Sequence, residues 1–280
     1  MPKVAAVVLL YYPTKEILLN LDTYKHHVNH LYIIDNSEKV QSILPQNDTL
    51  VYSNHITLLH DKENIGVSKA LNCALIEAKK TGFEWLLTMD QDSFFEENHM
   101  NEYLDHFKKC DRTNAGIISP LHNPKFVKSN IQNFYSEEEV VMTSGNLVNI
   151  THALEVGGYN EDLFIDEVDH EFCFKLHKYG YRVLQDQTVS MNHSLGRPHK
   201  DFSHINLYPP QRLYYMLRNY FYLKKEYSKE HPYFFRQRDF YLLKFFIKQL
   251  IFSNDRIASI KMMYRGYLDY KNNIVGKYHA

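Results

Sequence analysis

The stretch that decides the fold is Phe83-Glu-Trp-Leu-Leu-Thr-Met-Asp-Gln-Asp92, where an apolar run passes directly into two carboxylates. Residues 83–89 have the length and composition of a fully buried strand. Extended residues two apart point the same way, so Asp90 and Asp92 can face one hard cation such as Mg²⁺ or Mn²⁺. A solvated turn can carry the same D-x-D pattern, but its position after a buried strand favours a site.

Strand and helix patterns alternate along the chain on both sides of this stretch. Strands are predicted over residues 4–10, 30–35, 55–60, 115–119 and 140–143, and helices over 15–27, 67–81 and 166–179. This alternation predicts an α/β fold with a mixed, mostly parallel sheet flanked by helices. Ligands bind such sheets beyond the carboxyl ends of the strands. Asp35, Asn64 and Asp90 follow three predicted strands, which predicts one shared site.

The composition fits a globular protein of this class. The 280 residues are 44% hydrophobic and 23% charged, which suits one large domain or a domain with an appendage and excludes a disordered chain. The three cysteines form no C-x-x-C pair, so neither a disulfide framework nor a structural zinc site is indicated. The apolar run at 4–10 is too short to span a bilayer and lacks the flanks of a signal peptide. We therefore expect a cytoplasmic protein.

The formal net charge of −1 hides two opposite parts. Residues 1–195 carry 16 Lys and Arg against 27 Asp and Glu, whereas residues 196–280 carry 16 against 6. The basic part also holds 12 Tyr and 8 Phe, with long amphipathic helical patterns after residue 208. We place a boundary between an α/β domain (1–200) and a helical C-terminal extension (201–280), and expect an acidic partner for the extension alone.

Three further polar clusters have both a structural and a chemical interpretation. Residues 166–171 hold four carboxylates, which suit either the acidic first turn of a helix or a general base with a raised pKa. His193 is one of 16 histidines, which are more often structural than ligands, although with Asp92 it would complete half of a metal shell. Ser144 and Gly145 form either a tight connection or a close backbone approach to a ligand. The sequence contains no P-loop, dinucleotide-binding or nucleophile-elbow motif.

Several motifs occur in a characteristic order over about residues 3–220. They lie at Tyr12-Pro13 and at residues 34–37, 63–72, 85–93, 143–146, 163–173, 191–196 and 212–219. Together they resemble the inverting family 2 glycosyltransferases with the GT-A fold, and in particular the bacterial rhamnosyltransferase-like branch. The ordered combination is far more specific than any single motif.

The resemblance implies a nucleotide-sugar pocket at the strand ends. Asp35 would hydrogen-bond the base, Asn64 and Gly66 would line the nucleotide pocket, and Asp90 would lie near the ribose, diphosphate and metal. The other residues assigned to substrate or nucleotide binding are Tyr12, Pro13, Lys69, Ser144, Gly145 and Glu171.

The resemblance also implies a metal site and a catalytic base. Mg²⁺ or Mn²⁺ would be bound by Asp92 and Asp90, with His193 as a further ligand. Asp169 has the family's spacing for the base, four residues before Cys173. The base would take a proton from the acceptor hydroxyl, which attacks the anomeric carbon opposite the leaving nucleotide diphosphate.

The assignment of the base leaves an alternative open. Asp166 and Glu167 offer competing carboxylates just before Asp169, and Lys175 stands where the family more often has Arg. Glu171 is the acidic residue that follows the assigned base by two positions.

The function implied by the resemblance is transfer of a sugar in cell-surface polysaccharide biosynthesis. The donor implied by the resemblance is dTDP-L-rhamnose, with galactose, glucose or another hexose left open as the sugar. The acceptor would be a saccharide or lipid-linked saccharide. Two alternatives stay open, namely a nucleotidyltransferase and a non-catalytic saccharide-binding or membrane scaffold protein. The first is disfavoured because no glycine-rich basic loop follows the first strand, and the second because the carboxylates and His193 are all present.

Residues 232–252 interleave aromatic side chains with Lys and Arg. Lys244 and Lys248 interrupt the apolar run, so we expect the segment to lie in the headgroup region of an anionic inner leaflet rather than to span it. The alternative is that its aromatic face packs on the α/β domain or on a second subunit of a homo-oligomer. A nucleic-acid partner is not expected, because no such motif is present and the acidic part would repel phosphates.

Overall fold

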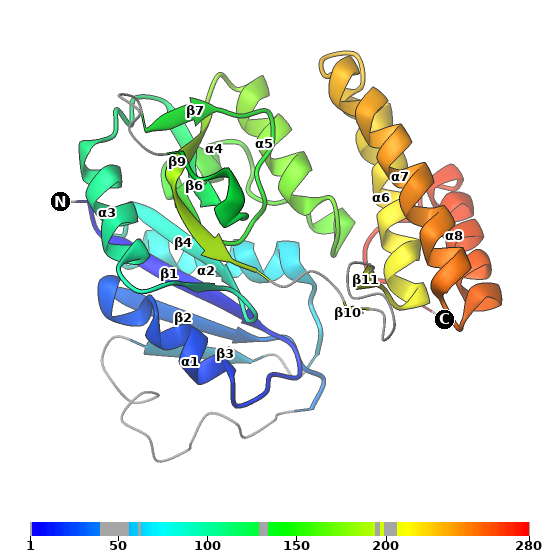
Figure 1. Ribbon diagram of the computed structural model, residues 1–280, viewed down its shortest axis with the longest axis horizontal. Coiled ribbons are helices and arrows are strands. Elements are labelled where there is room, and N and C mark those ends of the chain that lie inside the picture. The colour runs from blue at the N-terminus through cyan, green and yellow to red at the C-terminus, as the bar shows by residue number, and fades with distance from the viewer. Residues whose placement is uncertain are drawn as a thin grey trace. The chain divides into compact units, whose positions relative to one another are not determined.

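Figure 1 shows the computed structural model, which describes residues 2–39, 56–60, 63–128, 134–193, 197–198 and 206–279. Contacts divide the chain into two compact units. Unit 1 comprises Met1–Glu161 and Val168–Ser194, and unit 2 comprises Asp162–Glu167 and Leu195–Ala280. Residues 194–196 and 199–205, which include the end of the 191–196 motif, lie outside the described residues.

Unit 1 is built on one mixed sheet. Its strands are β1 (Val4–Leu10), β2 (His30–Asp35), β3 (Ile56–His60), β4 (Trp85–Asp90), β5 (Phe94–Phe95), β6 (Ala115–Leu121), β7 (Tyr135–Glu137), β8 (Asn146–Asn149) and β9 (Arg182–Asn192). Their order is β3-β2-β1-β4-β8-β6-β9-β5, with β7 paired to β9. Strands β1 to β4 run parallel, β6 is parallel to β9, and β8 lies antiparallel between β4 and β6. The predicted α/β fold with a mostly parallel central sheet is therefore confirmed.

Helices flank this sheet in the manner predicted (Figure 1). They are α1 (Ile17–Asp22), α2 (Val67–Lys80), α3 (His99–Lys109), α4 (Ile150–Glu155) and α5 (Val168–Lys178), with 3₁₀ turns η1 (Lys25–His27), η2 (Pro124–Phe126) and η3 (Glu161–Leu163). Helix α2 buries the apolar positions expected from its spacing, namely Ala70, Leu71, Ala74, Leu75 and Ala78. Gly82 follows it with a φ of +80°, a conformation that ends helices.

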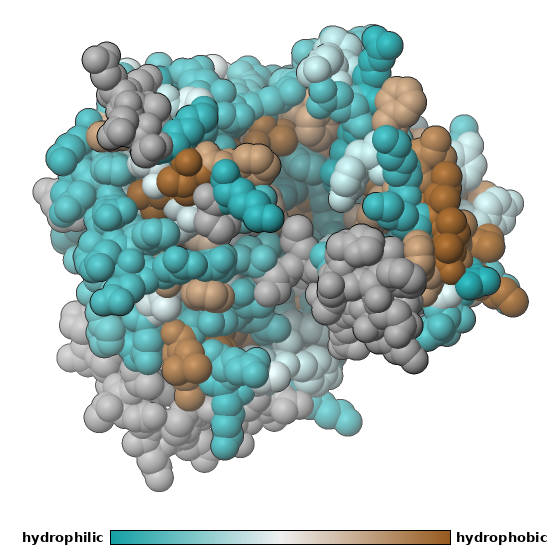
Figure 2. Space-filling view, viewed as in Figure 1, coloured by the Kyte–Doolittle hydropathy of each residue, from teal (hydrophilic) through white to brown (hydrophobic). Residues whose placement is uncertain are grey.

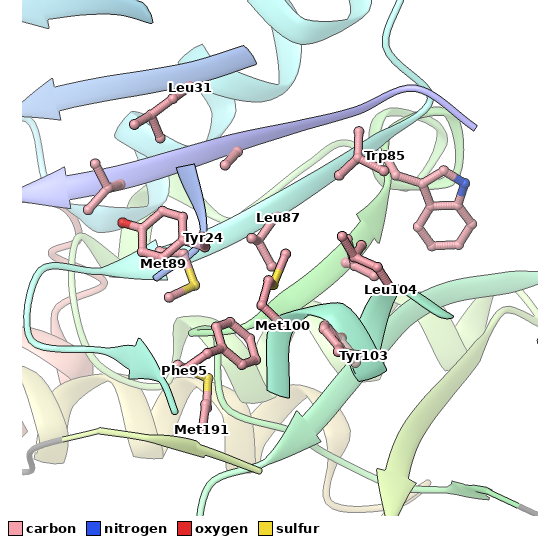
Figure 3. Close-up of a cluster of buried hydrophobic side chains, with 14 of the residues drawn as sticks. Tyr24, Leu31, Trp85, Leu87, Met89, Phe95, Met100, Tyr103, Leu104 and Met191 are labelled. Atoms are coloured by element: carbon pink, nitrogen blue, oxygen red, sulfur yellow. The ribbon is translucent and has the colours of Figure 1, made fainter. Parts of the chain in front are cut away.

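A large apolar cluster packs the central strands against α1 and α3 (Figure 3). Strand β1 is buried at every position, which explains its uninterrupted apolar sequence. Leu87 and Met89 of β4 join Met100 and Tyr103 of α3 in this cluster. Burial stabilises each such side chain by about 1.5–3 kcal/mol. The cluster therefore anchors the end of β4, from which Asp90 and Asp92 emerge.

Two predicted elements begin or break differently because of single residues. The helix predicted over 15–27 is divided into α1 and η1, because Tyr24 leaves the helical region with a φ of −138° and is fully buried. The helix predicted over 166–179 begins only at Val168. Asp166 and Glu167 precede it with φ angles of 64° and 61°, which a helix does not allow.

The strand predicted over 140–143 is wrong. The neighbour of β4 is β8, which begins three residues later at Asn146. The carbonyl of Thr143 instead accepts a hydrogen bond from the Thr88 hydroxyl (2.5 Å), and the N–H of Gly145 donates to the Thr88 carbonyl (2.7 Å). Residues 143–145 thus form a turn beside Thr88 where the end of a strand was predicted.

Unit 2 consists mainly of helices α6 (Pro210–Tyr227), α7 (Pro232–Phe252) and α8 (Arg256–Lys271), with a short antiparallel pair of β10 (Arg197–Pro198) and β11 (Asn206–Leu207). The predicted helical extension is confirmed. Gly266 allows α8 to pack closely on α6, since a Cβ there would lie 2.6 Å from the Tyr214 carbonyl oxygen. Within the described residues, no helix combines the length and apolar character needed to cross a membrane.

Candidate active site

Two carboxylates end strands on either side of β1. Leu10 is paired with Asp35 at the end of β2, and Leu9 with Asp90 at the end of β4. The parallel register therefore brings Asp35 and Asp90 to the same edge of the sheet. Asp35 is buried, and its Oδ1 accepts a hydrogen bond from the Ser37 N–H at 2.9 Å.

A tight turn before α2 is tied to the end of β2. Asn64 Oδ1 accepts from the Gly66 N–H (3.0 Å), and the Gly66 carbonyl accepts from Asn36 Nδ2 (3.2 Å). Gly66 has a φ of +84°, which residues with a Cβ rarely adopt. Asn64 and Gly66 thus lie at the edge that carries Asp35.

The remaining residues predicted on the nucleotide side surround this edge. Tyr12 follows β1 with a φ of 45°, and its N–H donates to Ser37 Oγ at 2.7 Å. Pro13 is buried beside it in the chain, whereas Lys69 is exposed in the first turn of α2. Their binding roles stay predictions.

Asp90, Asp92 and His193 form a compact group of possible metal ligands. One ligand atom from each lies within 4.8 Å of the others. His193 Nδ1 is 3.3 Å from Asp92 Oδ1 and 3.9 Å from Asp90 Oδ2. His193 directly follows β9, which pairs with β5 just beyond Asp92 and so brings the ring to the end of β4. Two carboxylates and an imidazole are a donor set that suits a divalent cation.

Two serines fix the orientation of this group. Ser93 Oγ lies 2.7 Å from His193 Nδ1. Ser144 Oγ accepts from the Asp90 N–H at 3.0 Å, and Ser144 is buried. Such outer contacts orient ligands and tune their affinity for a metal.

Gly145 makes a close approach to the protein's own side chains. Its φ is +82°, and a Cβ would collide with Met191 Sδ and lie 2.8 Å from Pro120 Cγ. Its carbonyl accepts from the Tyr103 hydroxyl at 3.1 Å. The geometry is that of a tight turn that leads into β8 beside β4.

The first two carboxylates of residues 166–171 are held in ion pairs within unit 2. Arg212 Nε lies 2.8 Å from Asp166 Oδ2, and Arg238 Nη2 lies 2.6 Å from Glu167 Oε1. Neither residue belongs to α5, so the interpretation of all four carboxylates as the acidic first turn of one helix is wrong.

The other two carboxylates lie in the first turn of α5. Asp169 is half-buried, and its Oδ1 accepts from the His170 N–H at 2.9 Å. Glu171 is buried, with Lys175 Nζ 3.6 Å from its Oε2. The same ammonium donates to the Gly158 carbonyl at 2.5 Å, so Lys175 joins α5 to the turn after α4.

Comparison with known proteins identifies the family. Residues 16–154, which include Asp35, Asn64, Asp90 and Asp92, match the family model described as Glycosyl transferase family 2. The chain belongs to glycosyl transferase family 2. It is 26% identical over 247 residues to the dTDP-rhamnosyl transferase RfbF of Shigella flexneri, and the alignment covers 79% of each chain.

Solved structures with a similar fold are GT-A glycosyltransferases. The crystal structure of GalNAc-T7 with UDP, GalNAc and Mn²⁺ has a TM-score of 0.60 at 13% identity, covering 98% of this chain and 56% of that one. The crystal structure of S. aureus TarS 1-349 has a TM-score of 0.53 at 12% identity, covering 97% of this chain and 72% of that one. The chain thus spans little more than half of the GalNAc-T7 chain. At these identities the likeness shows the fold alone.

In this glycosyl transferase family 2 chain, sequence reasoning missed His122. Its Nε2 lies 2.6 Å from the Ser144 carbonyl, and its ring contacts that of His193 edge-on. Burial lowers the pKa of His122 to about 4, although the Ser144 carbonyl and the Asp169 carboxylate act in the opposite direction. A carbonyl can only accept, so Nε2 carries the proton and Nδ1 is an acceptor. His122 follows β6 directly, and the rule of polar residues at strand ends could have found it.

Proposed function

We propose that this protein transfers L-rhamnose from dTDP-L-rhamnose to a hydroxyl of a saccharide or lipid-linked saccharide, with inversion at the anomeric carbon. The observation that carries the proposal is the group of Asp90, Asp92 and His193 at the end of β4, beside the edge that holds Asp35 and Asn64. The choice of donor is supported by the name of the RfbF relative.

The nucleotide would bind along the edge formed by the ends of β1, β2 and β4. The Asp35 carboxylate can accept hydrogen bonds from the N–H groups of a base, and its link to the Ser37 N–H orients it. Gly66 has no side chain, and its φ of +84° sets the turn next to Asn64, where a planar ring would be accommodated.

Asp90, Asp92 and His193 would hold Mg²⁺ or Mn²⁺, which, when bound, stabilises the negative charge that develops on the leaving diphosphate. Ser144 fixes the Asp90 backbone, and Ser93 fixes the His193 ring. These contacts would hold the Asp90 backbone and the His193 ring in place next to Asp92.

Asp169 is the carboxylate that we assign as the general base. Arg212 and Arg238 already pair with Asp166 and Glu167, whereas Asp169 lies at the start of α5. The acceptor hydroxyl gives its proton to Asp169 while the hydroxyl oxygen forms a bond to the anomeric carbon. The bond from that carbon to the diphosphate oxygen breaks on the opposite face, its electron pair leaves with the diphosphate, and the configuration inverts.

The proposal is tested by measuring release of dTDP from dTDP-L-rhamnose. Release should require both a saccharide acceptor and a divalent metal. Asp169→Asn should lower kcat by about 10²–10⁴-fold and spare donor binding, whereas Asp92→Asn should weaken both. Asp105→Asn removes an exposed carboxylate of α3 and should retain normal turnover. Near-normal turnover by Asp169→Asn would exclude that residue as the base.

A thermal-shift panel of nucleotide sugars with Mn²⁺ or Mg²⁺ tests the donor. Stabilisation by dTDP-L-rhamnose but not by UDP-sugars is the expected result. Stabilisation by UDP-sugars alone would contradict the proposed donor while leaving sugar transfer intact, and no response to any nucleotide sugar would count against the enzyme.

The extension supports a second part of the proposal, which is contact with an anionic membrane surface. Helix α7 buries a narrow stripe formed by Phe235, Leu242 and Gln249. The exposed large apolar residues of α7 and α8, here called the α7–α8 apolar surface, are Tyr233, Phe240, Tyr241, Leu243, Ile247, Ile251, Ile257, Ile260, Tyr264 and Tyr267. Figure 2 shows hydrophobic side chains running along these helices.

Cations lie within this surface. Lys244 is exposed on the same helical side as Phe240, Ile247 and Ile251, because these residues are three, four or seven positions apart. An exposed apolar face that carries lysines is the pattern of a helix lying in the headgroup region of anionic lipids. Such binding should weaken at high salt, because screening reduces the attraction.

Vesicle co-sedimentation tests this contact. The protein should bind phosphatidylglycerol-containing vesicles more strongly than pure phosphatidylcholine vesicles, and Phe240→Ser with Ile247→Ser should reduce binding. Leu19→Ser is the matched control, because Leu19 is an equally exposed apolar residue on α1. Unchanged binding by the α7 double variant would show that this surface does not contact the membrane.

A further inference from the structure

Residues 162–167 belong by contacts to unit 2, although the chain before and after them belongs to unit 1. The chain leaves unit 1 after Glu161 and returns to it at Val168, the first residue of α5. Asp169 is the next residue, so whatever fixes 162–167 also fixes the covalent entry to the helix that carries the proposed base.

The backbone of this segment has an unusual conformation. Phe164, Asp166 and Glu167 have φ angles of 64°, 64° and 61°. Residues with a Cβ rarely adopt such angles, and three of them in four positions persist only where the surroundings hold them in place. Strain of this kind clusters at functional sites.

Asn219 of α6 captures the backbone of the strained segment. Its Nδ2 lies 2.9 Å from the carbonyl oxygen of Leu163, 2.7 Å from that of Ile165 and 3.0 Å from that of Asp166. Asn219 is fully buried, so its amide group donates to the segment and not to solvent. The contacts are to backbone, which means that they fix the path of the chain.

Arg218, the residue before it, holds the start of the segment. Its Nη2 lies 3.2 Å from the carbonyl oxygens of both Asp162 and Leu163, and its Nη1 donates to the Gly276 carbonyl at 2.7 Å. Arg218 is also fully buried. A buried guanidinium whose bonds go to carbonyl oxygens is a rigid support for a loop.

Two ion pairs hold the end of the segment. Arg212 Nε lies 2.9 and 2.8 Å from the two carboxylate oxygens of Asp166, and Arg238 Nη2 lies 2.6 Å from Glu167. Arg212 and Asn219 are seven residues apart on α6 and therefore face the same side. This accounts for the 212–219 motif, for which the sequence offered no role.

We propose that Asn219, Arg218 and Arg212 are positioning residues for glycosyl transfer. They hold residues 162–167 in the strained conformation and thereby set where α5 begins and where the Asp169 carboxylate points. The inference rests on the proposed role of Asp169 as the base. A misplacement of about 1 Å can cost about 10²-fold in rate, so this support is needed for turnover and not for donor binding.

The test uses the full chain and compares Asn219→Ala with Tyr220→Phe. Tyr220 is the next residue of α6, is buried, and donates its hydroxyl hydrogen bond to Asp239 of α7 instead of to the segment. Asn219→Ala should lower kcat by about 10–100-fold, leave the donor Kd within about twofold, and speed amide hydrogen exchange over residues 163–169. Tyr220→Phe should change neither kcat nor that exchange.

Arg212 supplies a milder variant, because its side chain is 40% exposed and its loss is compatible with folding. Arg212→Ala should lower kcat several-fold, and Arg212→Lys should restore part of it. The inference is overturned if Asn219→Ala and Arg212→Ala both keep kcat within twofold of the natural protein. It is also overturned if Tyr220→Phe loses as much kcat as Asn219→Ala at the same melting temperature.

Asp169→Asn, measured alongside, separates this inference from the proposed function. An inactive Asp169→Asn, together with active Asn219→Ala and Arg212→Ala, would overturn the positioning role alone. A fully active Asp169→Asn would overturn the assignment of the base, and with it the reason for positioning that residue.

Discussion

Replacing Gly145 with alanine tests how the edge of the sheet is built. Gly145 has a φ of +82°, and a Cβ there would lie 2.8 Å from Pro120 Cγ and collide with Met191 Sδ. The left-handed conformation costs a residue with a Cβ about 1–2 kcal/mol, and overpacking costs about 1–3 kcal/mol. Gly145→Ala should therefore lower the free energy of unfolding by about 2–5 kcal/mol.

Gly157 provides the matched control. Its φ is +86°, but among the described residues no group beyond its chain neighbours lies within 4 Å of a Cβ built there. Gly157→Ala should carry the conformational cost alone, about 1–2 kcal/mol. Urea unfolding followed by circular dichroism measures both variants. Equal losses would refute the reasoning, because they would show that Pro120 and Met191 move aside at no cost.

Gly145→Ala should also weaken nucleotide binding, because the turn at Gly145 is hydrogen-bonded to the backbone of β4. The Gly145 N–H donates to the Thr88 carbonyl at 2.7 Å, and the neighbouring Ser144 hydroxyl accepts from the Asp90 N–H at 3.0 Å. Displacing this turn moves Asp90. The Kd for dTDP, measured by calorimetry, should rise in Gly145→Ala and stay unchanged in Gly157→Ala.

Three smaller predictions concern the same edge. Burial lowers the pKa of His122 from 6.5 to about 4, so the unfolded chain binds this proton at a higher pH than the folded protein does. The free energy of unfolding should therefore fall by about 2 kcal/mol from pH 7.5 to pH 5. In urea unfolding, His122→Gln should lack this contribution to the pH dependence. Ser144→Ala removes the hydroxyl that accepts from the part-buried Asp90 N–H, so it should cost about 0.5–1.5 kcal/mol and weaken dTDP binding; unchanged affinity would exclude the link. Tyr103→Phe should cost about 1–3 kcal/mol in urea unfolding yet keep turnover, since its hydroxyl donates to backbone carbonyls such as those of Ile118 and Gly145 and to none of the proposed ligand side chains.

The parallel part of the sheet could be predicted because β1, β2 and β4 are buried on both faces. Strand β1 shows this as seven apolar residues in succession. Strand β2 ends at Asp35 as predicted, and β4 ends at Asp90, one residue beyond the predicted strand. Strand β8 was missed because Asn146-Leu-Val-Asn149 is short and begins and ends with Asn. The run at 140–143 has more β-branched residues and a higher strand propensity, but the strand that pairs with β4 is β8. Context decided against propensity there.

The gathering of Asp35 and Asp90 could be predicted because it follows from parallel topology alone. His122 obeys the same rule at the end of β6, but the neighbours that make its position significant, β8 and β9, follow it in the chain. Their order across the sheet cannot be inferred from local patterns. Ser144 was found by its motif, while its bond to the Asp90 backbone depends on a turn that replaced a predicted strand.

The choice between Asp166 and Asp169 as the base shows most clearly what a local pattern leaves out. The two residues are only three positions apart in the chain. They differ in that Asp166 pairs with Arg212, 46 residues further along, just as its neighbour Glu167 pairs with Arg238, 71 residues further along. The excess positive charge of residues 196–280 was interpreted as attraction to an acidic partner outside the chain. For Arg212 and Arg238 that partner is the chain itself, at Asp166 and Glu167. Other cations of the extension are exposed, such as Lys244 of α7 and Lys261 of α8, and these would be the ones to contact a surface elsewhere. The proposed support of residues 162–167 and the proposed membrane contact would thus use different residues of the extension.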